Sequence, residues 1–367
     1  MTGKRMMSAL TAALLALTLT ACGPKEPEPV PTEPMPTEPA VEVIAPAEPE
    51  PTEPEPEIFV NPLTGEECAE ELTRQRPIAV MLNNHKKAQP QAGNAAADVI
   101  YEIPAEGGIT RMMALYQSVE GVGEIGTVRS ARDYYTSLAL GHDAIYLHAG
   151  GSDGAYIFIK ENKMTAMDCV NGPYEGTLFW RDKARWNKAG SMEHSVMTSG
   201  ETILELFPTY ENLRTEVRED HAVNWNFTTE APDAANEQAG KLTVPFSKYK
   251  TGVFVYDAES GRYLVEQYGG EYVDANTGEQ VEVDNVLVLY TEADVIKGDA
   301  AGRLKVRTTG EGEGILLRGG TVEPIVWKRA DQNSTLEFYR VDGTPALLSV
   351  GKTYINILDH EDVAYWE

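Results

Sequence analysis

The chain has 367 residues, with 31 Lys and Arg against 57 Asp and Glu, and a formal net charge of −26. Such an excess of negative charge argues against a nucleic-acid-binding protein, because those proteins neutralise phosphates with clustered cations. The longest apolar run, residues 6–19, is too short to cross a bilayer and lies at the extreme N-terminus. A multi-span membrane protein is therefore excluded.

Residues 1–22 have the pattern of a lipoprotein signal peptide. Lys4 and Arg5 precede the apolar run, and Leu19-Thr20-Ala21-Cys22 closes it with small residues before a cysteine. In such a sequence a diacylglyceryl group is placed on the cysteine thiol and the chain is cut before it. We predict a lipid anchor on Cys22 that holds the protein at the extracytoplasmic face of the cell membrane. An ordinary secretory signal with a chance cysteine is the alternative.

Residues 23–57 hold 12 of the 22 prolines, ten Glu and one Lys. Such a segment cannot build a core, and its Pro-Glu repeats favour an extended, self-repelling chain. We predict a disordered tether between the membrane and the folded part. Removing the signal (+2) and the tether (−9) from −26 leaves −19 for residues 58–367.

Two cysteines, Cys68 and Cys169, remain besides Cys22. A disulfide between them and a pair of free thiols are both compatible with an exported protein. No cysteine pair has the spacing of zinc ligands, and the six histidines include no H-E-x-x-H motif. We therefore expect neither a metal ion nor a cofactor.

Residues 58–230 are predicted to form an α/β layered domain. Short apolar runs favour strands at 77–82, 97–103, 110–118 and 143–149. A helix is expected from Ser130, as its cap, to about 140, where Gly141 stops it. Further helices are expected from 152 to 159 and from Thr198, as a cap, to about 207.

Residues 240–367 show little helical periodicity, and we predict a mostly β domain. The expected strands are 251–256, 262–267, 286–290, 304–308, 314–318, 321–328, 336–341 and 352–358. The fold class is therefore α+β overall, with an α/β layered domain followed by a β-rich one.

Three segments suggest ligand loops but are better explained as turns. Residues 121–126 match G-x-G-x-x-G, yet the helix is expected only at Ser130, so a hairpin loop is favoured over a dinucleotide site. Residues 274–278 resemble a calcium loop but lack Glu at the twelfth position, where Asn285 stands. Residues 310–314 read as a mobile turn.

Three arginines, Arg111, Arg129 and Arg132, fall where a predicted strand ends and a helix begins. Helix N-terminal amides and forked guanidinium donors together suit an anion. His148 and Ser152, at the end of a neighbouring strand, are placed to line the same cleft. The alternative is that each arginine pairs with a nearby acid in a structural network. The local acids are Glu102, Glu106, Glu124 and Asp133.

The order of several motifs resembles the YerB-like bacterial lipoproteins. The motifs lie at 61–65, 76–81, 106–111, 128–132 and 148–152, and in the second half at 256–257, 261–264, 276–279 and 351–354. The resemblance implies a two-domain envelope lipoprotein, mostly of Gram-positive bacteria, with a domain of unknown function and no established catalytic residues. This chain has Asn83 where Asp is usual in that family, Thr127 where Pro is usual, and Glu193-His194-Ser195 for Pro-His-Asn.

These features favour a non-catalytic, lipid-anchored module that binds an envelope protein or an anionic cell-wall ligand, and no nucleic acid. One alternative is an envelope enzyme acting on phosphate or carboxylate groups, in which the three arginines clamp the substrate and His148 or His194 is the acid–base group. A second alternative is a structural scaffold.

Overall fold

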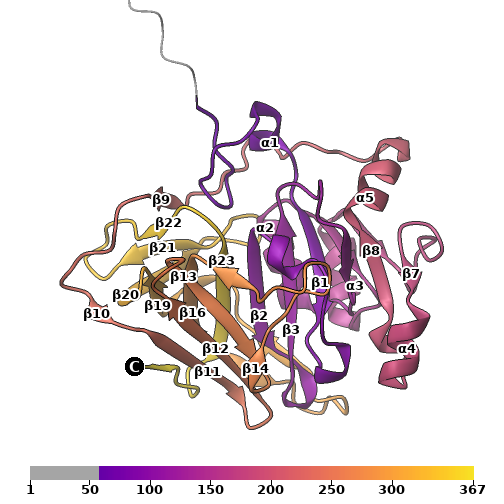
Figure 1. Ribbon diagram of the computed structural model, residues 1–367. Helices are drawn as coiled ribbons and strands as arrows, with labels where there is room; N and C mark the ends of the chain where they lie inside the picture. Colours follow the sequence, from indigo (N-terminus) through magenta and orange to yellow (C-terminus); the bar gives the residue numbers. More distant parts are fainter. Residues whose placement is uncertain (1–57) are drawn as a thin grey trace, which may run out of the picture. The chain divides into compact units, whose positions relative to one another are not determined.

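The computed structural model describes residues 58–367 (Figure 1). The predicted signal peptide, the predicted lipid anchor on Cys22 and the predicted tether of residues 23–57 lie outside the described residues.

The central element is an eleven-stranded sheet. Its order is β10-β20-β19-β16-β23-β2-β3-β1-β5-β6, with β21 paired to β20. The strands that come first in the chain are β1 (Ile78–Asn83), β2 (Val99–Pro104), β3 (Thr110–Tyr116), β5 (Ile145–His148) and β6 (Ala166–Asp168). Those that come later are β10 (Glu237–Gln238), β16 (Asn285–Thr291), β19 (Gly310–Arg318), β20 (Thr321–Arg329), β21 (Glu337–Arg340) and β23 (Thr353–Asp359).

Both halves of the chain contribute to this one sheet. β23 runs parallel to β2 on one side and parallel to β16 on the other. In Figure 1 the indigo and purple strands accordingly lie beside orange and yellow ones. The predicted mixture of an α/β first half and a β-rich second half is confirmed, and β23 joins the two through backbone hydrogen bonds.

The sheet is buried on both faces, which explains the continuous apolar runs seen in the sequence. Successive residues of β1, such as Val80 and Met81, belong to two different core clusters. One cluster includes Phe254 and Tyr263 of a second sheet, and the other includes Tyr135 of helix α2. The large sheet is thus the middle layer.

The second sheet has six strands in the order β14-β13-β12-β11-β24, with β15 paired to β13. Their bounds are β11 (Lys241–Ser247), β12 (Lys250–Asp257), β13 (Arg262–Gln267), β14 (Gly270–Glu271), β15 (Glu282–Val283) and β24 (Tyr365–Trp366). A three-stranded sheet contains β4 (Glu124–Gly126), β8 (Val196–Ser199) and β7 (Trp180–Arg181). Two further pairs are β17 (Ala293–Val295) with β18 (Leu304–Val306), and β9 (Asn226–Thr228) with β22 (Leu347–Ser349).

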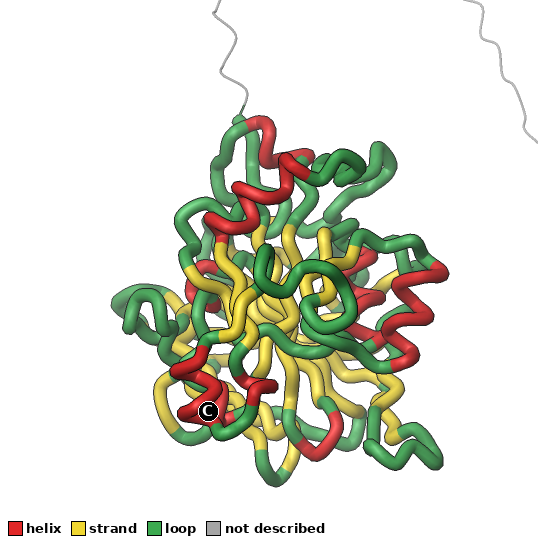
Figure 2. The backbone as a smooth tube through the Cα atoms, turned by 90° about the vertical axis from the view of Figure 1, so that its right-hand side faces the viewer, coloured by secondary structure: helices red, strands yellow, loops and turns green. Residues whose placement is uncertain are grey.

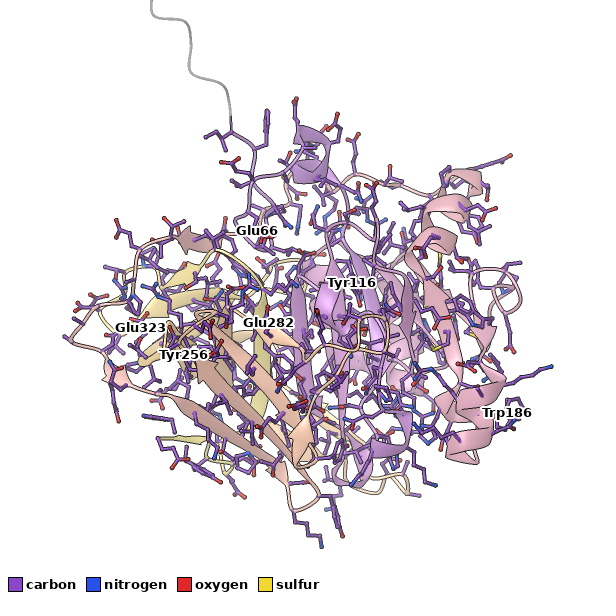
Figure 3. The ribbon with its side chains drawn as sticks, in the orientation of Figure 1. Glu66, Tyr116, Trp186, Tyr256, Glu282 and Glu323 are labelled. Carbon is purple, nitrogen blue, oxygen red and sulfur yellow. The ribbon has the colours of Figure 1, made fainter. Side chains whose placement is uncertain are left out.

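Helices lie around the strands (Figure 2). They are α1 (Glu70–Arg74), α2 (Asp133–Gly141), α3 (Asp153–Glu161), α4 (Lys183–Ala189) and α5 (Gly200–Leu206). Single 3₁₀ turns occupy Lys86–Ala88, Asn94–Ala96, Glu106–Gly108, Met192–His194 and Phe207–Thr209. Trp186 on α4 lies at the outer edge and is 39% exposed (Figure 3). Within residues 58–367, every helix is too short or too polar to span a membrane.

Two of the three predicted helix starts need correction. α2 begins at Asp133 after Arg132, so Ser130 does not cap it. α5 is capped by Ser199, whose hydroxyl accepts from the Thr202 amide at 3.1 Å, whereas the Thr198 hydroxyl donates to the Leu178 carbonyl at 2.8 Å. Ser152 caps α3 by accepting from the Ala155 amide. Helix α4 and strand β11 were not predicted.

The glycine-rich run 310–314 is not a mobile turn but the first half of β19. A Cβ on Gly312 would lie 2.5 Å from Nε1 of Trp327 and 2.7 Å from the Tyr290 carbonyl. Glycine is needed there because the indole of the neighbouring strand lies against the backbone.

The predicted turns at 121–126 and 274–278 contact one another. Asn276 donates from Nδ2 to the carbonyls of Val122 and Glu124, both at 2.8 Å. The Asp274 carboxylate accepts from the Ala95 amide at 2.8 Å. These polar residues therefore attach the second sheet to the first half of the chain, and a hydrogen-bonding role accounts for them without calcium.

Cys68 and Cys169 are both free thiols. The disulfide considered from the sequence is therefore not formed, and burial raises the pKa of the Cys169 thiol to about 12. A buried thiol of this kind is a poor nucleophile.

Candidate functional site

The candidate site lies where three parallel strands end. β5 pairs in parallel with β1 and with β6, so their carboxyl ends, at Asn83, His148 and Asp168, meet at one edge of the sheet. In open sheets with parallel strands, ligands bind in the crevice beyond these ends. The loops that follow the three strands build that crevice in this protein.

Arg129 is held at this edge by its own backbone. Its amide donates to the Met81 carbonyl at 2.9 Å, and its carbonyl accepts from the Ala149 amide at 3.0 Å. The loop between β4 and α2 is thereby fixed to β1 and to the end of β5. Because the backbone is fixed, the Arg129 guanidinium has a defined place in the crevice.

A pocket of about 410 Å³ opens beside Arg129. Arg181 of β7 lines the same pocket, so two guanidinium groups face one cavity. Its lining comprises Val128, Arg129, Ser130, Ala149, Gly150, Gly151, Tyr156, Val170, Asn171, Arg181, Met192, Glu193 and Val196. Carboxylates and phosphates are the groups that forked arginine donors recognise best.

Each pocket arginine has a carboxylate partner at the surface. Arg129 Nη2 lies 2.7 Å from Glu193 Oε2, and Arg181 Nε lies 2.8 Å from Glu175 Oε1. The two glutamates are 47% and 46% exposed, whereas the arginines are 21% and 15% exposed. Arg129 lowers the pKa of Glu193, although partial burial acts in the opposite direction. The carboxylate of each pair is exposed to water, so an incoming anion can compete with the glutamate for the guanidinium group.

His194 is buried next to the pocket residue Glu193, and its Nδ1 is hydrogen-bonded. Asn83 Oδ1 accepts from the His85 amide, so Asn83 Nδ2 faces His194 Nδ1 at 2.8 Å. Nδ1 must then accept, and the neutral ring carries its proton on Nε2, which is 3.6 Å from Glu193 Oε1. The His85 ring stacks on His194 with centroids 5.1 Å apart. Burial lowers the pKa of both imidazoles.

His148 is 1% exposed and does not line the pocket. Its Nδ1 donates to the Gly150 carbonyl at 2.9 Å, since a carbonyl can only accept. Burial lowers its pKa, against the effect of Asp168 at 3.8 Å. Asp168 in turn accepts from the amides of Gly150 and Val170 and from the Tyr156 hydroxyl. These bonds shape the loops around the pocket.

The structure separates the three predicted arginines. Arg111 and Arg132 both contact Glu106, Arg111 at 2.5 Å, and both are buried. Burial would raise the pKa of Glu106, but Arg111 and Arg132 lower it to about 2. The structural network considered as the alternative therefore accounts for these two residues, and only Arg129 reaches the pocket.

Ser152 and Arg132 line a separate pocket of about 350 Å³ between α3 and the β17–β18 hairpin. The Ser152 hydroxyl is already used in capping α3. The pocket's three cations, Arg132, Lys297 and Arg303, are matched by three acids, Asp133, Asp153 and Asp299. With no surplus of positive charge, this pocket is a weaker anion site.

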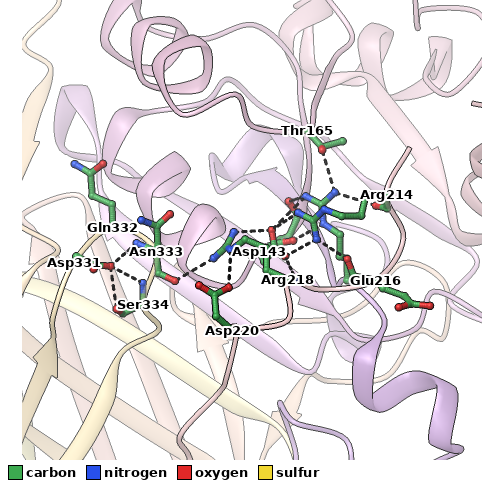
Figure 4. Close-up of polar contacts among 12 residues, drawn as sticks. Asp143, Thr165, Arg214, Glu216, Arg218, Asp220, Asp331, Gln332, Asn333 and Ser334 are labelled. Atoms are coloured by element: carbon green, nitrogen blue, oxygen red, sulfur yellow. Dashed lines mark hydrogen bonds and ion pairs between the residues drawn. The ribbon is translucent and has the colours of Figure 1, made fainter. Parts of the chain in front are cut away.

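A third group of arginines surrounds Asp143 at the opposite edge of the sheet (Figure 4). Arg214 makes two hydrogen bonds to the Asp143 carboxylate, at 2.6 and 2.7 Å, and Arg218 contributes one from its side chain and one from its amide, both at 2.8 Å. Arg76 uses its guanidinium on backbone carbonyls and Thr165. These contacts hold the segment around 214–218 against the sheet, which is a structural role.

Among residues 58–367, no three His, Cys, Asp or Glu side chains come together as metal ligands. Sequence reasoning did not select Arg181, His85 or Tyr156. Arg181 lies on the two-residue strand β7, far in sequence from Arg111, Arg129 and Arg132, and no motif marks it.

Two sequence families match consecutive parts of the chain. Residues 63–213 match the N-terminal domain, and residues 242–355 the C-terminal domain, of a protein of unknown function, DUF3048. The chain is 30% identical over 307 residues to "Putative lipoprotein YerB" of Bacillus subtilis (strain 168), covering 83% of this chain and 87% of that protein. The chain belongs to the DUF3048 family.

A solved family structure agrees with this assignment. The crystal structure of the YerB protein from Bacillus subtilis aligns with a TM-score of 0.72 and 28% sequence identity, covering 84% of this chain and 99% of that one. The two DUF3048 domains meet in the large sheet, because β2 lies in the first matched region and β23 begins in the second. Family membership brings no established activity, so function must be argued from the site.

Proposed function

We propose that this DUF3048 protein is a lipid-anchored envelope protein that binds an anionic ligand of the cell wall in the Arg129–Arg181 pocket, without catalysing a reaction. The observation that carries the proposal is that Arg129 and Arg181 line one 410 Å³ pocket and that the carboxylate partner of each is exposed at the surface. In a folded part with a net charge of −19, two such cations in one cavity favour an anion there.

Binding is favoured over catalysis by the state of the histidines. A general acid–base group must reach the substrate with a free nitrogen. His148 and His194 are 1% and 4% exposed, and the Nδ1 of each is engaged by Gly150 and Asn83 respectively. The proposed enzyme mechanism therefore has little support from these residues.

Anchoring is proposed from Leu19-Thr20-Ala21-Cys22 and from the similarity to the Bacillus subtilis protein named as a putative lipoprotein. Radiolabelled palmitate fed to cells should enter the wild-type chain and should not enter Cys22→Ala. Equal labelling of both chains would contradict the anchor, and protease accessibility in intact cells would test the extracytoplasmic face.

The ligand class is tested by calorimetric titration of the full-length protein in detergent with soluble poly(glycerol phosphate). We expect Arg129→Gln and Arg181→Gln each to weaken binding about tenfold, the equivalent of about 1.4 kcal/mol. Arg262→Gln is the matched control, because Arg262 is also a paired surface arginine but lies on β13 in the second sheet. Equal affinity for all four proteins, or no binding by the wild type, would contradict the proposal.

A further inference from the structure

A buried cluster where the two halves of the chain meet brings together a lysine, a glutamate and an asparagine. Lys250, at the start of β12, and Glu102, in β2, have side chains that are 0% exposed. Lys250 Nζ lies 2.9 Å from Glu102 Oε1, and Asn84 Nδ2 donates to the same oxygen at 2.8 Å. Because Lys250 Nζ and Asn84 Nδ2 contact the same oxygen, the distance between them cannot exceed the sum of 2.9 and 2.8 Å.

The surroundings of Lys250 are aromatic and dry. Nζ lies 5.3 Å from the ring centroid of Phe246 and 5.4 Å from that of Tyr268. The Tyr268 hydroxyl donates to the Asn84 carbonyl, which holds the asparagine backbone against the same ring. Burial in this environment lowers the pKa of the Lys250 amine, although Glu102 acts to raise it. A neutral amine is the nucleophilic form of lysine.

The two amide atoms of Asn84 differ in their contacts, because Nδ2 donates to Glu102 Oε1 and to Thr110 Oγ1, both at 2.8 Å, whereas Oδ1 has no partner among residues 58–367. Lys250 Nζ has the Glu102 carboxylate as its ion-pair partner. A buried polar atom without a partner typically costs about 1–3 kcal/mol. Glu102, in contrast, is firmly placed, because Thr110 donates to Oε1 and Tyr354 donates to Oε2. The carboxylate is thus fixed between an amine and an amide.

We propose that Lys250 and Asn84 form an intramolecular isopeptide bond, with Glu102 as the group that transfers the protons. Glu102 takes a proton from the Lys250 ammonium, and the free Nζ attacks Cγ of Asn84. The Nζ–Cγ bond forms, the Cγ–Nδ2 bond breaks, and a second proton passes from Nζ to Nδ2 through Glu102. Nδ2 leaves as ammonia, and the first proton stays on Glu102 or leaves with it as ammonium. No oxidant or cofactor is required.

The bond would link the end of β1 to the start of β12. These positions lie in the regions matched by the N-terminal and C-terminal DUF3048 domains respectively. A covalent tie between them restricts the unfolded chain and so stabilises the folded one. This inference does not depend on the anion pocket, whose lining does not include Asn84, Glu102 or Lys250.

The test is mass spectrometry of the full-length protein, extracted in detergent, denatured and digested. We expect one cross-linked product that contains Asn84 and Lys250 and is lighter than the two peptides together by one ammonia. Recovery of the wild type entirely as two separate peptides, with the Asn84 amide intact, would overturn the proposal.

Variants separate chemistry from folding. Lys250→Arg keeps the buried positive charge but has no nucleophilic amine, so it should fold and remain unlinked. Glu102→Gln should also remain unlinked, and a full yield of the linked product in that variant would refute the role of Glu102. Lys248→Met is the matched control, since this exposed lysine lies two residues away. It should form the bond in full, and loss of the bond in Lys248→Met would contradict the assignment to Lys250.

Discussion

Asn83 donates a hydrogen bond to Nδ1 of His194 across 2.8 Å. Protonation of Nδ1 would place two donors face to face in a buried site, so the contact holds the imidazole neutral. An aspartate at the same position would instead accept from a protonated Nδ1. The identity of residue 83 therefore sets the charge of His194.

Asn83→Asp should raise the pKa of His194 by about one unit, because a carboxylate stabilises the imidazolium. An NMR titration of the histidine ring signals measures this directly. His148, on the neighbouring strand end, provides an internal reference that should titrate as before. An unchanged His194 titration would show that Asn83 does not control the ring.

Glu193→Gln should tighten the binding of poly(glycerol phosphate) about two- to fivefold. The substitution removes the carboxylate that pairs with Arg129 at 2.7 Å, and exposed pairs of this kind contribute up to about 1 kcal/mol. The comparison is Glu282→Gln, which removes a carboxylate paired with Arg262 in the second sheet. Weaker binding by Glu193→Gln would mean that Glu193 itself contacts the ligand.

Glu106→Gln should lower the free energy of unfolding by about 3 kcal/mol. The substitution leaves Arg111 and Arg132 buried without their shared carboxylate, and breaking a buried ion pair from one side is costly. Urea denaturation measures the loss. Glu120→Gln, an exposed neighbour in sequence, should change stability by less than about 0.5 kcal/mol.

His142 should make the protein less stable in acid. Burial lowers its pKa from 6.5 to about 3, and its Nε2 contacts the Tyr101 hydroxyl at 2.8 Å. The His142 imidazole takes up a proton near pH 6.5 in the unfolded chain but only near pH 3 in the folded one. The contribution of His142 to the free energy of unfolding is therefore complete above pH 6.5 and is lost as the pH falls toward 3. Between pH 7 and pH 5 the loss from this group is about 2 kcal/mol. His142→Gln should reduce the measured pH dependence by that amount, and an unchanged dependence would contradict the assignment.

Gly312→Ala should destabilise the protein by about 1–3 kcal/mol, because the added methyl group would overlap the Trp327 indole and the Tyr290 carbonyl. Thermal unfolding checks this. Gly270→Ala on β14 is the control, since nothing lies within 4 Å of its new Cβ. Similar melting temperatures for both variants would show that residue 312 can accept a methyl group beside Trp327 and Tyr290 without strain.

The sequence was a good guide to individual strands of the core. The run 262–267 was predicted with the bounds that β13 has, because Tyr263, Leu264 and Val265 favour a strand and a turn-forming segment, 257–261, precedes them. The run 310–314 was not, since its glycines resemble a loop locally. The glycine at 312 is explained by the indole of Trp327 on the neighbouring strand. That contact depends on the tertiary structure, so it cannot be predicted from the local sequence.

The site was harder to predict for a related reason. Arg111, Arg129 and Arg132 look equivalent in sequence, and only the position of Glu106 distinguishes the buried pair from the pocket residue. Arg181 lines the pocket because β7 pairs with β8. This pairing is so short that the sequence around Arg181 shows no strand-like alternation. Strand pairing of this kind is decided by the whole fold.

The position of β23 also governs when the protein can fold. This strand, Thr353–Asp359, is the last long strand of the chain, yet it lies between β16 and β2 in the middle of the sheet. Until residues 353–359 have been synthesised, β2 and β16 each keep an unpaired inner edge. Residues 353–359 therefore complete the centre of the sheet only after β16, β19 and β20 have been synthesised, and a chain truncated shortly before residue 353 would lose the connection between its halves rather than a peripheral strand.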